Sequence, residues 1–256
     1  MAKVKTQTEW EVEMSEKILG YTRNEIYLEL RFLDIALSGL APRADGAVST
    51  FATDGTYLNF STEQVLRVFR QNPFFLNRLY LHTVLHCLFS HLWIGGNRTP
   101  ALWHLACDIA VEYVIDGMDK ACTRRILSFT RSELYRKLEE SGTAVSAAVV
   151  YRMLLGARLL ALEKEFYTDD HRYWPKQQDD SAKQQAVVAS QKKWNKIARQ
   201  TSMEQQRRGD ETQEGEELLA AQLAAERGRR SYRDFLKKFA GRGEGLHADP
   251  DEFDLN

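Results

Sequence analysis

The sequence LHTVLHCLFSHLW, residues 81–93, places three histidines in a largely apolar segment. We expect residues 74–93 to form a helix. On such a helix His82 and His86 lie one turn apart, about 40° from each other around the axis, so both imidazoles share a face. Two imidazoles placed in this way can bind one tetrahedral zinc ion. The alternative is a buried helix whose histidines each bond to a carbonyl or a carboxylate.

A third histidine, His91, follows His86 by five residues. On a continuous helix it would lie about 140° around the axis from His86. His91 can therefore join the same metal only if the helix ends near Ser90.

The next predicted helix covers residues 101–118, and three polar side chains recur on it at every fourth position: His104, Asp108 and Glu112. They form a narrow stripe on an otherwise apolar helix, and buried carboxylates are costly unless they are paired or bind a metal. If the loop at 95–100 closes a helical hairpin, Asp108 becomes a third ligand and leaves a fourth position for water. The alternative is a solvent-exposed stripe with a salt bridge to an arginine.

Zinc is the cofactor that this pattern favours, because four of the six histidines lie between residues 82 and 104. Imidazole and carboxylate also suit iron, nickel or manganese, so another divalent metal stays open. Cys87 and Cys107 flank the ligand positions, and we expect Cys87 to belong to the core.

The rest of the chain predicts a mainly α fold (α+β class). We expect helices over residues 9–40, 61–70, 130–140 and 145–166, and a small β-hairpin around Asp54-Gly55 in VSTFATDGTYLNF. After residue 175 the composition shifts toward Gln, Lys, Glu and Arg, which indicates a charged helical or partly disordered linker over 176–230.

The overall composition excludes several classes of protein. The 35 Lys and Arg residues nearly balance the 36 Asp and Glu residues, so nothing favours binding to nucleic acid or to an anionic membrane. No apolar run has the length of a membrane span. The three cysteines show no CxxC spacing, which favours a reducing, cytoplasmic location over a disulfide framework.

Three blocks in order resemble the bacterial predicted-metallopeptidase domain found beside von Willebrand A-like domains. They are HTVLHCLFSHLW, LWHLACDIAVEYVI with its A-x-D, and the hairpin FATDGTYLNF that precedes them; SYRDFLKKF and DPDEFD near the end also fit. The resemblance implies a helical domain over 1–175 with a zincin-like two-helix metal site. It assigns the metal to His82, His86 and Asp108. It also implies that 231–256 begins a connection to a C-terminal domain outside this chain.

The same resemblance implies partners. These are a protein or peptide, a von Willebrand A-like domain, and a MoxR-type AAA ATPase.

Thr83 is the departure from the H-E-x-x-H pattern of that family. The missing glutamate takes the proton from zinc-bound water, and its loss typically lowers the rate about 10²–10⁴-fold. We therefore expect a zinc-binding module with impaired or no peptidase activity in a larger assembly. The alternative is an active zinc peptidase with Glu112 as general base, although Glu112 also suits a role as acceptor for the N–H of a metal-bound histidine. A helical scaffold without metal is a third hypothesis.

One further stretch, TDDHRYW at 168–174, combines carboxylates, a histidine and aromatic rings. It could contribute Asp170 or His171 to the surroundings of the metal. The alternative is a loop held in place by its aromatic side chains.

Overall fold

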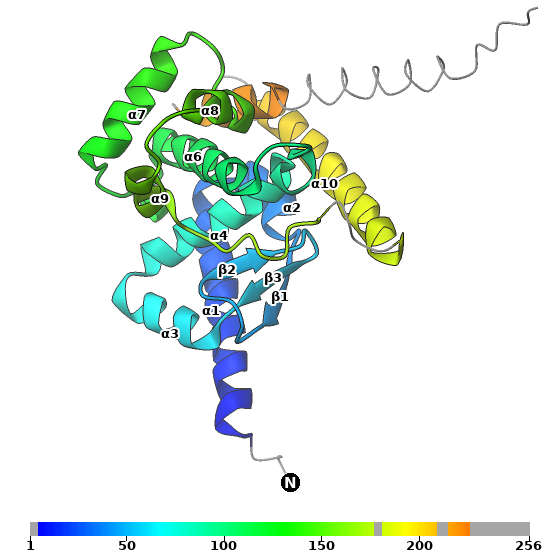
Figure 1. The fold of residues 1–256 in the computed structure, drawn as a ribbon. Helices are drawn as coiled ribbons and strands as arrows, with labels where there is room; N and C mark the ends of the chain where they lie inside the picture. Colours follow the sequence, from blue (N-terminus) through cyan, green and yellow to red (C-terminus); the bar gives the residue numbers. More distant parts are fainter. Residues whose placement is uncertain (1–4, 177–180, 209–214, 226–256) are drawn as a thin grey trace, which may run out of the picture.

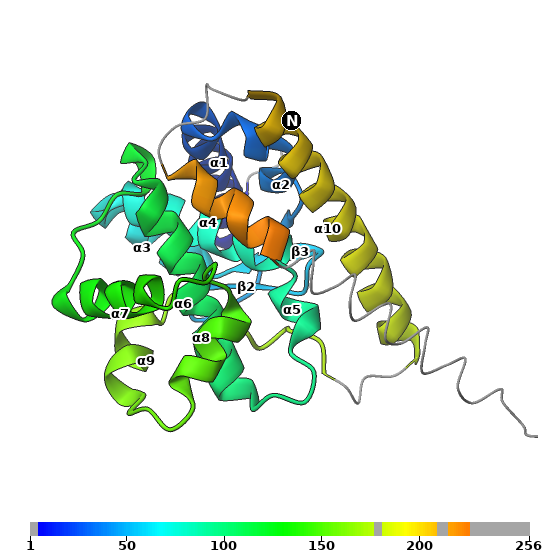
Figure 2. The same ribbon diagram turned by 90° about the horizontal axis from the view of Figure 1, so that it is seen from above.

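The computed structural model describes residues 5–176, 181–208 and 215–225. The protein is mainly helical with one small mixed sheet, which confirms the predicted fold class. Helix α4 (Pro73–Leu88) runs through the centre, and α1 (Gln7–Glu29), α6 (Pro100–Met118) and the sheet pack around it (Figures 1 and 2). Every residue from Leu76 to Leu88 is buried, so the histidines of this helix lie in the interior.

Local signals set both ends of α4. At the start, the Asn72 side chain accepts a hydrogen bond from the Phe75 N–H at 3.3 Å, and Pro73 occupies the first turn, where a missing N–H has no cost. At the end, Ser90 adopts a left-handed conformation with φ 66°. The chain then begins the short helix α5 (His91–Ile94), so the predicted helix over 74–93 is divided just before His91.

The sheet has the strand order β1-β3-β2. Strands β2 (Phe51–Thr53) and β3 (Tyr57–Phe60) form the predicted antiparallel hairpin, and Gly55 in its turn has φ 84°. Strand β1 (Ala41–Ala44) pairs with β3 in parallel. Its four residues are all exposed, so no apolar alternation marked it in the sequence.

The predicted first helix over 9–40 is shorter in the structure. It ends at Glu29 and is followed by the 3₁₀ turn η1 (Arg31–Leu33) and helix α2 (Asp34–Leu37). The predicted helix over 145–166 divides at Gly156, which has φ 79°, a conformation that L side chains rarely adopt. The remaining elements are α3 (Thr62–Gln71), η2 (Ala121–Thr123), α7 (Phe129–Glu140), α8 (Ala147–Leu154), α9 (Leu160–Phe166) and α10 (Ser181–Arg208).

Helix α10 lies along one side of the molecule and packs against α2 and α4 (Figure 1). The Trp194 side chain is fully buried, and its Nε1–H donates to the Gly55 carbonyl at 2.7 Å. A Cβ on Gly39 would lie 2.6 Å from the Trp194 ring, so only glycine permits this approach. The domain limits at 175 and 230 stay predictions, and the predicted connection over 231–256 lies outside the described residues.

Residues 167–176, which we call the strap, follow α9 and cross α4 and β2 in a largely irregular conformation (Figure 1). The Asp170 N–H donates to the Phe51 carbonyl at 2.7 Å, and Asp170 forms a parallel bridge with Ala52. Neighbours of an extended residue point to the side opposite its own side chain. Asp169 and His171 therefore both face the interior.

Within the described residues, no helix combines the length and apolar character that crossing a membrane requires.

Candidate metal centre

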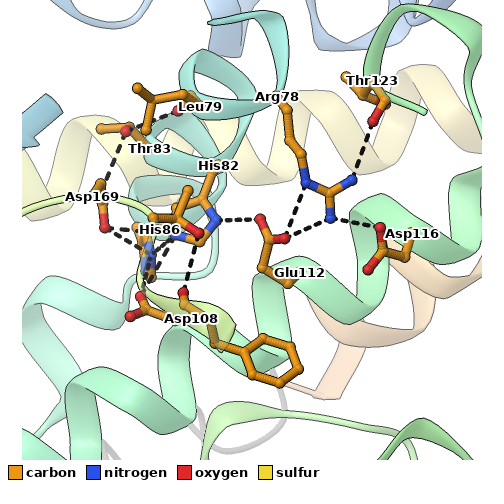
Figure 3. A network of polar contacts seen from close by, with 12 residues as sticks. Arg78, Leu79, His82, Thr83, His86, Asp108, Glu112, Asp116, Thr123 and Asp169 are labelled. Carbon is orange, nitrogen blue, oxygen red and sulfur yellow. Dashed lines mark hydrogen bonds and ion pairs between the residues drawn. The ribbon is translucent and has the colours of Figure 1, made fainter. Parts of the chain in front are cut away.

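Four buried side chains from three elements meet beside α4. His82 and His86 come from α4, Asp108 from α6 and Asp169 from the strap, and one ligand atom of each lies within 4.8 Å of all the others (Figure 3). His82 and His86 are completely buried, and Asp108 and Asp169 are only 6% and 2% exposed. The structure thus brings together the three predicted ligands and adds a second aspartate.

The distances among these atoms suit one ion. The two histidine Nε2 atoms are 2.8 Å apart, and Asp108 Oδ1 lies 3.5 Å from His82 Nε2 and 3.2 Å from His86 Nε2. Asp169 Oδ1 lies 3.6 Å and 3.8 Å from the same two nitrogens. Donors that each bind zinc at about 2.0–2.1 Å lie roughly 3–3.5 Å from one another. One cation can therefore reach all four atoms after small adjustments.

The two carboxylate oxygens that face this centre lack ordinary partners. Asp108 Oδ1 and Asp169 Oδ1 are buried and accept no hydrogen bond from any described residue, although imidazole nitrogens lie at ion-pair distance. Other buried polar atoms of the described residues also lack a hydrogen bond, but these two are carboxylate oxygens that face the same point, where leaving a charge unpaired is most costly. A cation between them would satisfy both.

Protons on the imidazoles balance the two carboxylates in the metal-free protein. Burial alone would lower the pKa of His171, but the nearby Asp108 and Asp169 carboxylates raise it to about 10. Burial also opposes the charged form of His82, and the same carboxylates again raise its pKa. Burial lowers the pKa of His86 to about 4, which keeps this imidazole neutral. A divalent cation would supply the same two positive charges.

Thr83 points toward the strap. Its hydroxyl lies 3.1 Å from the Leu79 carbonyl and 3.3 Å from Asp169 Oδ2, and these two acceptors share its one proton (Figure 3). The Thr83 side chain, between the two histidines of α4, therefore helps to orient a carboxylate that arrives from a distant part of the chain.

Glu112 lies on the opposite side of the His82 ring from the centre (Figure 3). Its Oε1 accepts from His82 Nδ1–H at 2.8 Å, while Oε2 accepts from Arg78 at 2.5 Å and from Arg131 at 2.7 Å. Burial opposes ionisation of Glu112, but the Arg78 charge and the His82 contact hold its pKa well below the usual value. The carboxylate thus fixes His82 with Nε2 directed at the centre.

A buried ionic network continues behind Glu112. Arg78 and Arg131 also bind Asp116, at 2.6 Å and 3.0 Å, and Tyr135 donates to Asp116 at 2.7 Å. Arg131 further contacts Glu165 of α9, immediately before the strap, at 2.9 Å. Arg131 therefore joins Glu112 and Asp116 of α6 to α9, the helix that precedes the strap.

The other histidines predicted from the sequence take different positions. His91 Nδ1 lies 3.0 Å from His86 Nδ1, behind the ring, so His91 orients His86 from outside the four-residue group. The half-buried His104 packs against the rings of His171 and Trp174 at 4.8 Å and 4.9 Å. His171 also lies outside the four-residue group but comes closer, because its Nε2 lies 3.1 Å from Asp108 Oδ1 and 2.8 Å from Asp169 Oδ1.

Asp169 is the residue that the sequence analysis missed. Asp170, its neighbour, turns outward and binds Arg172 at 2.7 Å. In an extended segment, successive side chains point to opposite sides. Applied to TDDHRYW, this rule places Asp169 and His171 on one side and Asp170 on the other, which is the signal that could have identified Asp169. Cys87 stays outside the four-residue group, and burial raises the pKa of its thiol far above the usual value.

Comparisons with known proteins find no matching family model, no matching curated protein and no matching solved structure. The metal centre therefore rests on its own geometry.

Proposed function

We propose that this protein binds one divalent metal ion, zinc in the simplest case, through His82, His86, Asp108 and Asp169. The ion holds α4, α6 and the strap together, and the domain has no effective peptidase activity. The observation that carries this proposal is the pair of buried aspartate oxygens that accept no hydrogen bond among the described residues and face the two Nε2 atoms.

Among the residues that the structure describes, none is placed as a base for metal-bound water, which favours binding over hydrolysis. A zinc peptidase needs a carboxylate that takes the proton from metal-bound water. Thr83 stands where that carboxylate would be, and its hydroxyl is engaged with Leu79 and Asp169. Glu112 is directed at the far side of His82 and is held there by Arg78 and Arg131. That Glu112 acts as a general base stays a prediction, which a peptidase assay on Glu112→Gln tests.

Burial supports the same conclusion. A metal ion polarises a substrate carbonyl only by direct contact. His82 and His86 are 0% exposed and Asp169 is 2% exposed, so a peptide has no approach to the ion without movement of the strap.

The proposal also places the domain in a larger assembly. The proposed partners, a von Willebrand A-like domain and a MoxR-type AAA ATPase, are supported by the sequence resemblance alone.

Metal analysis of the purified protein tests the metal site. We expect one equivalent of zinc in the wild type after dialysis against dilute zinc, and its loss in His82→Ala and in Asp108→Ala. His104→Ala is the matched control, because His104 lies beside the site without joining the group. Retention of zinc by both ligand variants, or no zinc in a folded wild type, would overturn the proposal.

A peptidase assay on the zinc-loaded wild type tests the second half of the proposal. We expect no cleavage above that of the metal-free protein. Zinc-dependent cleavage that disappears in Glu112→Gln would establish the alternative, with Glu112 as the base.

A further inference from the structure

We infer that His171 is a fifth ligand of the proposed ion, and that the ion thereby fastens the strap over the site. This inference rests on the proposed function, because it requires a metal at the centre. It assigns the strap two of five donors, Asp169 and His171, so metal loading and closure of the strap become one event.

The position of the His171 imidazole supports its role as ligand. Its Nε2 lies 3.1 Å from Asp108 Oδ1 and 2.8 Å from Asp169 Oδ1, the first within and the second slightly below the roughly 3–3.5 Å expected for neighbouring donors on one zinc ion. All three atoms are buried, and no well-directed hydrogen bond links them. They are close enough for one cation to contact all three, in place of the ion pairs that His171 makes in the metal-free protein.

Trp174 keeps His171 in this orientation. Its ring lies 4.0 Å from the His171 ring and 5.1 Å from the His86 ring, and it is only 6% exposed. The strap therefore supplies two donors and an apolar cover, which together exclude water from the centre.

The strap's other anchors are weaker than a metal bond. Tyr173 donates to Asp45 at 2.6 Å, Asp170 bonds to the Phe51 carbonyl, and Arg172 donates to the Ala47 carbonyl. Each such hydrogen bond contributes only about 0.5–1.5 kcal/mol. Without a cation, the Asp169 carboxylate of the closed strap is paired only with imidazoles, including those of His86 and His171. The ion would add direct bonds to Asp169 and His171 that the other anchors do not provide.

Three imidazoles and two carboxylates would give a neutral complex with a divalent cation. Zinc accepts at most five ligands of this kind in most protein sites, so the set leaves no position for a reacting water. The strap thus provides a physical reason for the proposed absence of hydrolysis, separate from the identity of residue 83.

Limited trypsin digestion of the full chain tests the inference. The strap contains two exposed trypsin sites, Arg172 and Lys176. If the open strap lacks the metal, zinc at 100 times its Kd slows cleavage at these sites by up to about 100-fold relative to chelated protein. Mass spectrometry of the fragments assigns the cut, and cleavage after Lys5 serves as an internal control, because Lys5 lies outside the strap on an exposed segment.

His171→Ala separates the strap from the rest of the site. We expect this variant to bind zinc more weakly and to lose most of the zinc-dependent protection, while His104→Ala keeps both. If the wild type binds no zinc, the proposed function fails and the inference fails with it. If the wild type binds one equivalent and zinc leaves cleavage at Arg172 and Lys176 unchanged, the inference alone is overturned. The same holds if His171→Ala is protected as well as the wild type.

Discussion

The Thr83 hydroxyl lies 3.3 Å from Asp169 Oδ2, across 86 positions of sequence. Thr83 occupies the second position of the H-x-x-x-H helix turn, and its short side chain leaves space for the carboxylate that the strap delivers. Thr83 and Asp169 are therefore two parts of one arrangement, in which a carboxylate reaches the centre from the strap and not from α4.

A glutamate at position 83 is expected to destabilise this protein. In Thr83→Glu, a third carboxylate would be buried beside Asp169 and Asp108. We expect the chelated variant to lose about 2 kcal/mol or more of unfolding free energy relative to Thr83→Gln, which has the same size without the charge. Urea denaturation measures the difference.

The zinc-loaded Thr83→Glu protein should also gain no peptidase activity, because the strap still covers the centre. A variant that is as stable as Thr83→Gln and cleaves peptides with zinc would show that the site is an intact peptidase lacking only its base.

Glu112→Gln tests how His82 is held in place. The amide cannot balance Arg78 and Arg131, and breaking a buried ion pair in this way typically costs about 3–5 kcal/mol. We also expect the zinc affinity to fall about 10–100-fold, as it does when the acceptor behind a metal-bound histidine is removed. Competition with a chromophoric chelator measures the affinity.

Glu165→Gln is the matched control for Glu112→Gln, because Glu165 pairs with the same Arg131 but does not contact His82. Its zinc affinity should equal that of the wild type. Equal losses of affinity in both variants would show that the ionic network acts on general stability and not on His82.

Removal of the metal should lower thermal stability. Zinc at 100 times its Kd adds about 2.7 kcal/mol to the folded state. For a domain of this size that corresponds to a rise in Tm of roughly 5–10 °C. Calorimetry with zinc and with chelator measures the shift, and His82→Ala should show almost none. An equal shift in His82→Ala would place the stabilising zinc elsewhere.

Helix α10 should unfold together with the body of the protein. Trp194→Ala removes a fully buried ring and its bond to Gly55, and truncations of this kind typically cost about 3–5 kcal/mol. Met203→Ala, on the same helix but 57% exposed, should change stability by less than about 0.5 kcal/mol. Urea denaturation that gives the same result for both variants would show that α10 behaves as a separate linker.

The part of the site that could be predicted from sequence was predicted from helical periodicity. His82, His86 and Asp108 follow from four-residue spacings on two neighbouring apolar helices, because such spacing fixes which side chains share a face. The predicted hairpin around Gly55 rests on equally local turn chemistry. A helix end near Ser90 was named only as the condition under which His91 could reach the metal. It could not be predicted outright, because the left-handed conformation of Ser90 has no clear sequence signal.

The strap could not be predicted from such local patterns. Asp169 lies 61 positions beyond Asp108 in a segment without regular secondary structure, and only its bridge to Ala52 sets which side chains face inward. Strand β1 was missed because it is exposed and pairs in parallel with β3, beyond the intervening strand β2, so no local hairpin pattern marks it. Both features depend on long-range contacts.

The most direct test of the central claim is anomalous diffraction at the zinc edge from crystals of the zinc-loaded protein. We predict one strong peak at about 2.0–2.2 Å from His82 Nε2, His86 Nε2 and a carboxylate oxygen of Asp108. A zinc-loaded crystal with no peak between α4 and α6, or with its zinc on other side chains, would contradict the account.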